Sequence, residues 1–318
     1  VSEKIFSGFA GNLALSAVAK PCVGLQTADN ARFLRYWFEV SLGKIGFGCE
    51  SSEIAKESKK KWFPYNKGGG SRRWYGQQEY IINWWNDGEE VRNNKGAVIR
   101  NPQYYFHSSI SWSKVSSSAI AFRYYPKGFI FADAGMSIFS NENLFILSAY
   151  CNSSICANFI TLMSPTMNYE AGQVSQIPYK PITPDNKILK ETAKQNISIS
   201  KQDWDSHETS WDFQRNELLR IGDELVGDVS HVTTAEMPTV ENDLLAMCGE
   251  TPHPLNFSLK DLVSQYKQKW EHKFKQLHEN EEELNRQFID IYGLQDELTP
   301  DVPLNEITIL QQGEISIE

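Results

Sequence analysis

The chain has few cysteines, and they lack the spacing of a metal site or a disulfide framework. The five residues Cys22, Cys49, Cys151, Cys156 and Cys248 are odd in number, and no Cys-x-x-Cys pair occurs among them. Cys151 and Cys156 stand five positions apart in an apolar stretch, which favours two residues of a hydrophobic core. The sequence therefore predicts a reduced, cytoplasmic protein.

Long hydrophobic runs are also absent, and so is the pattern of a secretory signal. No apolar run approaches the roughly 18 residues that a membrane-spanning helix needs, so we expect no membrane partner. The 318 residues are 41% hydrophobic and 12% aromatic, which excludes a disordered chain. The first residue is Val1 rather than Met, and we therefore expect a piece of a longer protein.

The chain also lacks a recognisable catalytic or cofactor motif. Residues 6–11 mimic a cofactor-binding F-x-G-x-G loop, but only five residues precede them, too few for the strand that must support such a loop. Asn101-Pro102-Gln103-Tyr104 departs at Gln103 from the Asn-Pro-Pro-Tyr signature of amino methyltransferases. No phosphate-binding loop occurs, and the six histidines form no ligand pattern. We therefore expect neither turnover nor a bound cofactor in this chain itself.

Charge and aromatic residues divide the chain into two unlike parts. Residues 1–180 carry 19 Lys and Arg against 13 Asp and Glu, a net charge of +6. Residues 181–318 carry 12 against 27, a net charge of −15, and the two parts sum to −9. Of the 39 aromatic residues, 30 lie in the first part. This asymmetry indicates a face that meets a polyanion, whereas the alternative is two ordinary solvated surfaces.

The residue pattern predicts an α+β fold whose strands are mostly antiparallel. Residues 1–55 are predicted to be a helical lead-in, in which Phe33, Trp37 and Val40 share one helical face. Residues 56–180 are predicted to be an α+β domain, because short aromatic and β-branched runs alternate there with turn residues. The predicted strands are residues 80–82, 104–106, 110–115, 119–125 and 129–131, and a buried helix follows over residues 144–163.

Residues 181–318 are predicted to form a mainly helical, acidic spacer or scaffold, which begins at a cluster of prolines around Pro181. Ser258 and Asp261 predict a capping box, and Gly293 predicts the end of the same helix. Between them an apolar residue recurs every seven positions, at Val263, Trp270, Leu277, Leu284 and Ile291. This seam predicts a long helix near 258–292 that packs along another helix, either of this chain or of a partner.

Cations interleaved with aromatic residues predict contact with nucleic acid. Seven cations stand between Lys56 and Arg73 against one acid, Glu57, and three glycines follow Lys67. On the strand around Trp112, alternation predicts that Ser111 and Ser113 project together toward base edges while Trp112 enters the core. The candidate DNA-binding residues are Lys59, Lys60, Lys61, Lys67, Arg72, Arg73, Arg100, Ser111, Ser113, Lys114 and Arg123. The alternative for the lysine-rich segment is an ordinary exposed loop.

An ordered series of motifs runs through nearly the whole chain. It includes Lys-Trp-Phe-Pro-Tyr-Asn-Lys-Gly-Gly at 61–69, Arg-Trp-Tyr-Gly at 73–76, and the segments 100–106, 110–114, 122–131, 134–139, 152–153 and 164–169. Segments 24–33, 203–213 and 285–298 extend the series. It resembles the target-recognition domain and following helices of PglX-type adenine-specific DNA methyltransferases of the BREX phage-defence system. Pieces such as Ile-x-Trp-Ser also resemble TaqI-like specificity domains of other restriction–modification enzymes.

The resemblance implies a parent protein that uses S-adenosylmethionine to methylate an adenine flipped out of the duplex. It implies that this chain binds double-stranded DNA, and that cofactor and catalysis belong to an N-terminal methyltransferase domain missing here. Other BREX or restriction–modification subunits are further expected partners. The alternative is that the acidic helical part is a scaffold that docks other defence subunits, with incidental DNA contact.

Overall fold

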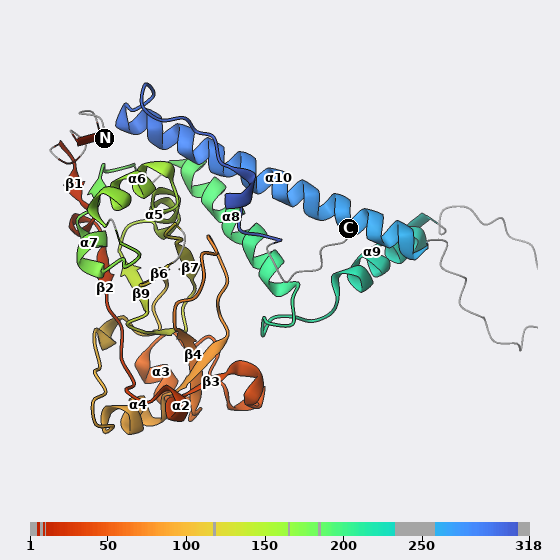
Figure 1. Ribbon diagram of the computed structural model, residues 1–318. Coiled ribbons are helices and arrows are strands. Elements are labelled where there is room, and N and C mark those ends of the chain that lie inside the picture. The colour runs from red at the N-terminus through yellow and green to blue at the C-terminus, as the bar shows by residue number, and fades with distance from the viewer. Residues whose placement is uncertain are drawn as a thin grey trace, which may run out of the picture.

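The computed structural model describes residues 5–6, 9, 11–116, 119–164, 166–183, 186–232 and 258–310, with the side chains of 225–232 left aside. Within these residues the α+β class is confirmed: short strands pair in three sheets, and long helices follow in the C-terminal part (Figure 1). The sheets are antiparallel except where β4 pairs in parallel with β8. Cys248, and Pro184 of the proline cluster around Pro181, lie outside the described residues.

The first sheet has four strands, in the order β2-β9-β6-β7, with the bounds that follow. Its strands are β2 (Lys20–Cys22), β9 (Gly135–Phe139), β6 (Ser109–Ser113) and β7 (Arg123–Tyr125). All five residues of β6 are buried, because this strand lies inside the sheet and both of its faces are covered. Trp112 is fully buried, as its place in the alternating pattern predicts.

The second sheet has the order β3-β5-β4-β8, and a third, two-stranded sheet pairs β1 with β10. The strands are β3 (Leu34–Tyr36), β5 (Tyr80–Asn83), β4 (Trp62–Asn66) and β8 (Ile130–Phe131), with β1 (Leu13–Ala14) on β10 (Pro178–Tyr179). Three short helices surround the second sheet (Figure 1). They are α2 (Asn30–Phe33), α3 (Ser52–Glu57) and α4 (Trp85–Arg92). The short 3₁₀ turns are η1 (Leu15–Ala17), η2 (Trp37–Glu39), η3 (Leu42–Lys44), η4 (Pro102–Tyr104) and η5 (Leu304–Glu306).

Two predictions for this region are wrong. The expected helix through Phe33, Trp37 and Val40 ends at Phe33, because the next three residues pair with β5 as strand β3. The described part of residues 1–55 includes strands β1, β2 and β3 besides short helices. The expected strand at 104–106 is replaced by η4, since Pro102 fixes the φ angle that starts a tight helical turn.

The expected helix over 144–163 is broken into α5 (Leu144–Cys151) and α6 (Ser154–Met163), bent by 64°. Asn152 lies at the break and bonds to the backbone just before β7: its Oδ1 accepts from Phe122 N at 3.1 Å and its Nδ2 donates to Phe122 O at 3.0 Å. Ser153 then caps α6 by accepting from Cys156 N. The bent pair has the length and composition of a span, whereas none of the single helices described here is long and apolar enough to cross a membrane.

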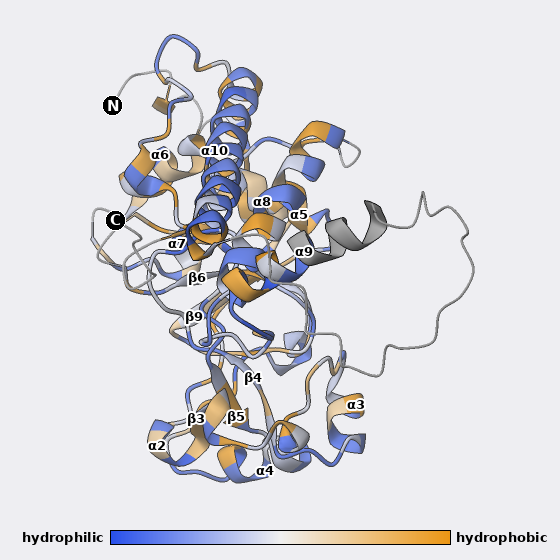
Figure 2. Cartoon of the chain, turned by 90° about the vertical axis from the view of Figure 1, so that its right-hand side faces the viewer, coloured by the Kyte–Doolittle hydropathy of each residue, from blue (hydrophilic) through white to orange (hydrophobic). Residues whose placement is uncertain are grey.

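The long helices pack on one another and on α5, whereas α7 (Ala171–Ser175) packs against β2. The long helices are α8 (Lys187–Asp205), α9 (Glu217–Val232) and α10 (Leu259–Tyr292). As the capping box predicts, Asp261 N donates to Ser258 Oγ while Ser258 N donates to Asp261 Oδ2 at 2.7 Å, and Gly293 ends α10 with a φ of 69°. In Figure 2 the outward face of α10 is mostly hydrophilic, whereas the seam residues Trp270, Leu277 and Leu284 are buried.

One hydrophobic core joins the first sheet to these helices. Trp112 of β6, Leu147 of α5, Leu277 of α10 and Ile309 near the described C-terminal end belong to the same buried cluster. A second cluster fills the second sheet and its short helices, and includes Cys22 and Cys49. The helices beyond residue 180 thus complete the core of the first sheet, and the apolar seam of α10 is packed within this chain.

We expect Leu277→Ala to lower the free energy of unfolding by about 2–5 kcal/mol, because it removes a fully buried side chain from the seam. Leu259→Ala, on the same helix but 69% exposed, is the matched control and should cost much less. Chemical denaturation measures both. An equal decrease in the free energy of unfolding for the two variants would show that the buried seam does not stabilise the packing of α10.

Candidate nucleic-acid interface

The segment that follows β4 crosses from the second sheet to the first. Lys67 begins it, and Gly68 passes so close to Ala134 that a Cβ there would lie 2.6 Å from the Ala134 carbonyl oxygen. Gly68 also has a φ of +77°, which side chains disfavour. The glycines therefore let this backbone lie directly on the first sheet, where it covers the serine-bearing face of β6.

Arg72 and Arg73 anchor this segment to the long helices rather than projecting into solvent. Arg72 Nη2 donates to Asp203 Oδ2 of α8 at 2.6 Å, and both side chains are buried. Arg73 Nη1 donates to Glu281 Oε2 of α10 at 2.8 Å, and its Nη2 donates to Glu306 at 3.0 Å. Both guanidinium groups are therefore engaged by carboxylates from distant parts of the chain.

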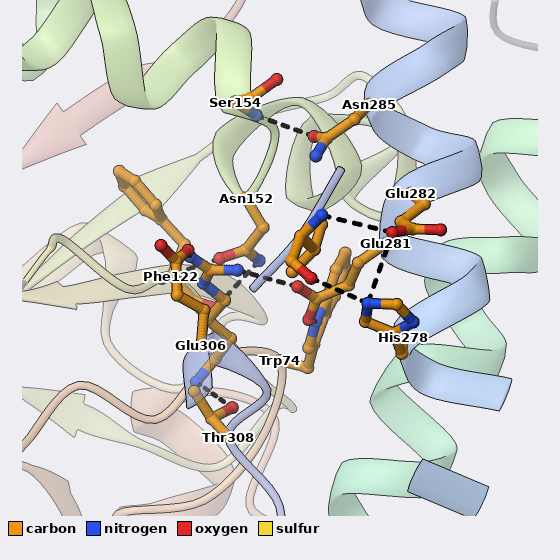
Figure 3. Close-up of polar contacts among 12 residues, drawn as sticks. Trp74, Phe122, Asn152, Ser154, His278, Glu281, Glu282, Asn285, Glu306 and Thr308 are labelled. Carbon is orange, nitrogen blue, oxygen red and sulfur yellow. Dashed lines mark hydrogen bonds and ion pairs between the residues drawn. The ribbon is translucent and has the colours of Figure 1, made fainter. Parts of the chain in front are cut away.

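Glu281 joins two neighbouring side chains of the segment (Figure 3). Its Oε1 accepts from Trp74 Nε1 at 2.7 Å while its Oε2 accepts from Arg73, and the carboxylate is 3% exposed. Burial raises the pKa of Glu281, and Arg73 and Trp74 oppose that rise. Burial by itself would lower the pKa of Arg73, but Glu281 and Glu306 raise it. A charged pair in this setting is stable only while each partner is present.

Arg123 is fully buried beneath the same segment. It donates to the carbonyl oxygens of Gly70 at 2.9 Å and Arg72 at 3.1 Å, and to Ser113 Oγ at 2.8 Å. Burial lowers the pKa of Arg123. Its guanidinium therefore holds the glycine-rich backbone in place.

The expectation that Ser111 and Ser113 project outward is wrong, since they are 0% and 7% exposed. Ser111 Oγ accepts from Asn66 Nδ2 at 2.6 Å and donates to Met136 O at 2.8 Å. Ser113 Oγ accepts from Gly69 N at 3.0 Å. The alternation around Trp112 is correct, but the chain itself covers the serine face.

The remaining candidate cations lie at the surface in separate places. Lys59 to Lys61 precede β4: Lys59 is exposed, Lys60 Nζ donates to Gly43 O, and Lys61 Nζ lies 3.8 Å from Glu90. Arg100 is half-buried in the loop after α4. Lys67 and Lys114 lie near the opposite end of β4, where Lys67 Nζ is 4.6 Å from the centre of the Tyr80 ring and Lys114 Nζ is 2.9 Å from Glu170.

Two adjoining cavities, of about 410 and 340 Å³, meet at Lys67 and Ala134. We call them together the Lys67 groove. The larger is lined by Gln26 and Asp133, whose side chains bond at 2.7 Å from Nε2 to Oδ2. The smaller is lined by Lys114 and by polar residues of the glycine-rich segment. The groove thus brings two lysines together with amide, carboxylate and hydroxyl groups.

Gln26 and Asp133 were missed as candidates by the residue pattern. They meet because Leu25 bridges Ala132 and Gln26 bridges Val98, in pairings between residues about 70 to 110 positions apart. Local residue spacing cannot predict pairings over such distances. The motif at 24–33 includes Gln26, but the sequence analysis assigned that residue no role. Among the described residues, no group of three His, Cys, Asp or Glu side chains is placed to hold a metal ion.

Glu281→Gln should lower the free energy of unfolding by about 3–5 kcal/mol, because it removes the buried carboxylate paired with Arg73 and leaves only Glu306, which is 48% exposed, to balance that charge. Glu283→Gln is the control, since Glu283 on the same helix pairs with Arg286, which is 52% exposed, and should change stability by about 1 kcal/mol or less. Thermal and chemical denaturation check both. A Glu281→Gln protein as stable as the control would contradict the anchoring role.

Comparison with known proteins identifies relatives over most of the chain. The chain is 38% identical over 296 residues to the adenine-specific methyltransferase PglX of Lacticaseibacillus casei (strain Zhang), covering 90% of this chain and 22% of that protein. It is 39% identical over 191 residues to the adenine-specific methyltransferase BrxX of Escherichia coli O9:H4 (strain HS), covering 59% of this chain and 15% of that protein. No family model matches the chain.

The chain therefore spans about a fifth or less of the length of these relatives. Across 90% of its own residues it nevertheless aligns with one of them, and this agrees with the ordered series of motifs. The resemblance inferred from the sequence is confirmed: over the segment that they share, the chain is a homologue of PglX-type proteins.

Proposed function

We propose that this chain is the DNA-recognition part of an adenine-specific methyltransferase of BREX-type phage defence, and that it contacts double-stranded DNA at the Lys67 groove. The names of the relatives support the methyltransferase assignment of a parent protein. In that parent, S-adenosylmethionine and the catalytic motif belong to a methyltransferase domain outside this chain. Other subunits of the defence system are proposed partners.

The observation that carries the DNA proposal is the composition of the Lys67 groove. Lys67 and Lys114 can approach phosphates, since the ion pair of Lys114 with Glu170 is exposed and such pairs are weak. Gln26 and Asp133 carry the donors and acceptors that distinguish base edges in a groove. Cations for the backbone beside polar groups for the bases are the two components of a DNA-reading surface.

Lys59, Lys60, Lys61 and Arg100 are proposed as additional phosphate contacts. They do not line the Lys67 groove, so we assign them no role in base recognition. Arg72, Arg73, Arg123, Ser111 and Ser113 are left out of the proposed surface, because their polar atoms are used inside the fold. The proposed interface therefore depends on lysines, which bind phosphates as mobile point charges.

The scaffold alternative loses its main support from the α10 seam. Leu277 and Leu284 belong to the main core cluster and Trp270 is 2% exposed, so these three seam residues, among those described, are not free to meet a partner. DNA recognition remains the function that the exposed groups favour.

Changing both Lys67 and Lys114 to Ala should weaken binding to any duplex at low salt and reduce the salt slope by about 2, one for each lost phosphate contact. Lys275→Ala, which removes a 66% exposed lysine of α10, is the matched control and should leave affinity unchanged. Fluorescence anisotropy with duplex DNA across a salt titration measures all three proteins. If the double variant binds like the control variant, the groove is not the DNA-binding surface.

Replacing Lys59, Lys60 and Lys61 together with Glu should weaken binding to all sequences alike, because contacts with phosphate carry no sequence information. The same anisotropy assay, run with duplexes of different sequence, checks this. Wild-type affinity at low salt would assign these lysines to an ordinary exposed loop.

The purified chain should transfer no methyl group from S-adenosylmethionine to duplex DNA, because it contains neither the cofactor loop nor the Asn-Pro-Pro-Tyr signature. A radiolabelled transfer assay tests this expectation. Methylation that disappears when residues of this chain are changed would contradict it.

A further inference from the structure

A third cavity, of about 510 Å³, lies where the loop between α8 and α9 reaches the second sheet. Its described lining shares no residue with the Lys67 groove. Phe47, Phe129 and Trp211 supply aromatic walls, and Tyr75 and Gln78 line it from the segment that leads into β5. The size is within the range of small-molecule sites in proteins. We call it the Trp211 pocket.

The aromatic walls are arranged around Trp211. Its ring centre lies 5.2 Å from that of Phe47 and 5.8 Å from that of Phe129. Phe47 is 39% exposed, so its ring is accessible from solvent, whereas Phe129 is 6% exposed and fixes the pocket floor. Aromatic rings with an accessible face are suited to stacking against another planar ring.

Gln78 provides an unused hydrogen-bond donor in this wall. Its side chain is 2% exposed, and among the described residues Nε2 has no hydrogen-bond partner. Buried polar atoms without partners are uncommon and costly, so such a donor points to a group that it would bind. The backbone just before it is strained, with positive φ angles of 69° at Trp74 and 60° at Gln77. Strain of this kind is frequent at binding sites.

The charges around the pocket favour a base over a phosphate. Lys201 Nζ is held by Asp205 at 2.5 Å and Asp212 at 2.9 Å, and Lys127 Nζ is held by Glu50 at 2.6 Å. Each of the two cations that line the pocket is thus balanced by a carboxylate. An anion would gain little electrostatic attraction from these paired lysines. A neutral ring that accepts a hydrogen bond from Gln78 would instead satisfy the buried donor.

We propose that the Trp211 pocket binds a nucleobase, which stacks on Phe47 and Trp211 and, once the buried Gln78 side chain turns toward the cavity, accepts a hydrogen bond from Gln78 Nε2 through a ring nitrogen or carbonyl oxygen. The base can come from a free nucleotide or from an unpaired position in DNA. The pocket goes beyond the proposed function and does not depend on duplex binding at the Lys67 groove.

The test uses the whole chain and two kinds of probe. One arm measures binding of the four common nucleoside monophosphates by isothermal titration calorimetry. The other measures binding of a duplex that carries one unpaired base, compared with the same duplex fully paired. The variants are Phe47→Ala, Trp211→Ala and Gln78→Met, and circular dichroism checks that each folds. Phe38→Ala, which removes a 64% exposed ring that does not line the pocket, is the matched control.

We expect Phe47→Ala and Trp211→Ala each to weaken binding about 5- to 100-fold, the range for loss of one stacking contact, while Phe38→Ala has no effect. The effect on monophosphates identifies a nucleotide site, and an effect confined to the unpaired-base duplex identifies a DNA site. The proposal is overturned if neither probe binds, or if the variants bind both probes like the control. Because Phe47 is partly exposed, Phe47→Ala keeps the proposal testable if Gln78→Met does not fold. Loss of duplex affinity in the variants of Lys67 and Lys114, with unchanged pocket binding, separates the two proposals.

Discussion

The fold depends on a few buried guanidinium groups that join a sheet segment to helices far along the chain. Arg72 pairs with Asp203 on α8, and Arg73 pairs with Glu281 on α10. Arg123 holds the same segment from below. These contacts fix one stretch of backbone that borders the Lys67 groove at its start and supplies Tyr75 and Gln78 to the Trp211 pocket at its end.

This arrangement separates the cations by role. The arginines of the segment bond to carboxylates and carbonyl oxygens within the fold, and the cations that line the groove, among the described residues, are the half-buried Lys67 and Lys114. A structural arginine is well suited to its position, because its planar group makes several directed bonds at once. An exposed lysine can follow a phosphate with little geometric demand. Recognition of bases would then rest on uncharged and acidic groups such as Gln26 and Asp133.

Features set by local sequence could be predicted, whereas those set by distant pairing could not. The capping box at Ser258 and the burial of Trp112 follow from spacing within a few residues. Arg73 was predicted to contact DNA because its carboxylate partners, Glu281 and Glu306, stand 208 and 233 positions away in the sequence. No local pattern could show that these carboxylates pair with it. Ser111 and Ser113 do share one face of β6, as predicted. That face is buried because Asn66 of β4 and the backbone at Gly69 lie against it. Helical spacing around Phe33 failed because pairing with β5 is non-local.

Hydrogen–deuterium exchange of the chain with and without duplex DNA tests the central claim most directly. If the Lys67 groove is the DNA-binding surface, DNA should slow exchange in peptides that cover residues 24–30, 67–71 and 113–116, because these segments line it. Slowed exchange confined to α8 and α10, with these peptides unchanged, would contradict the account.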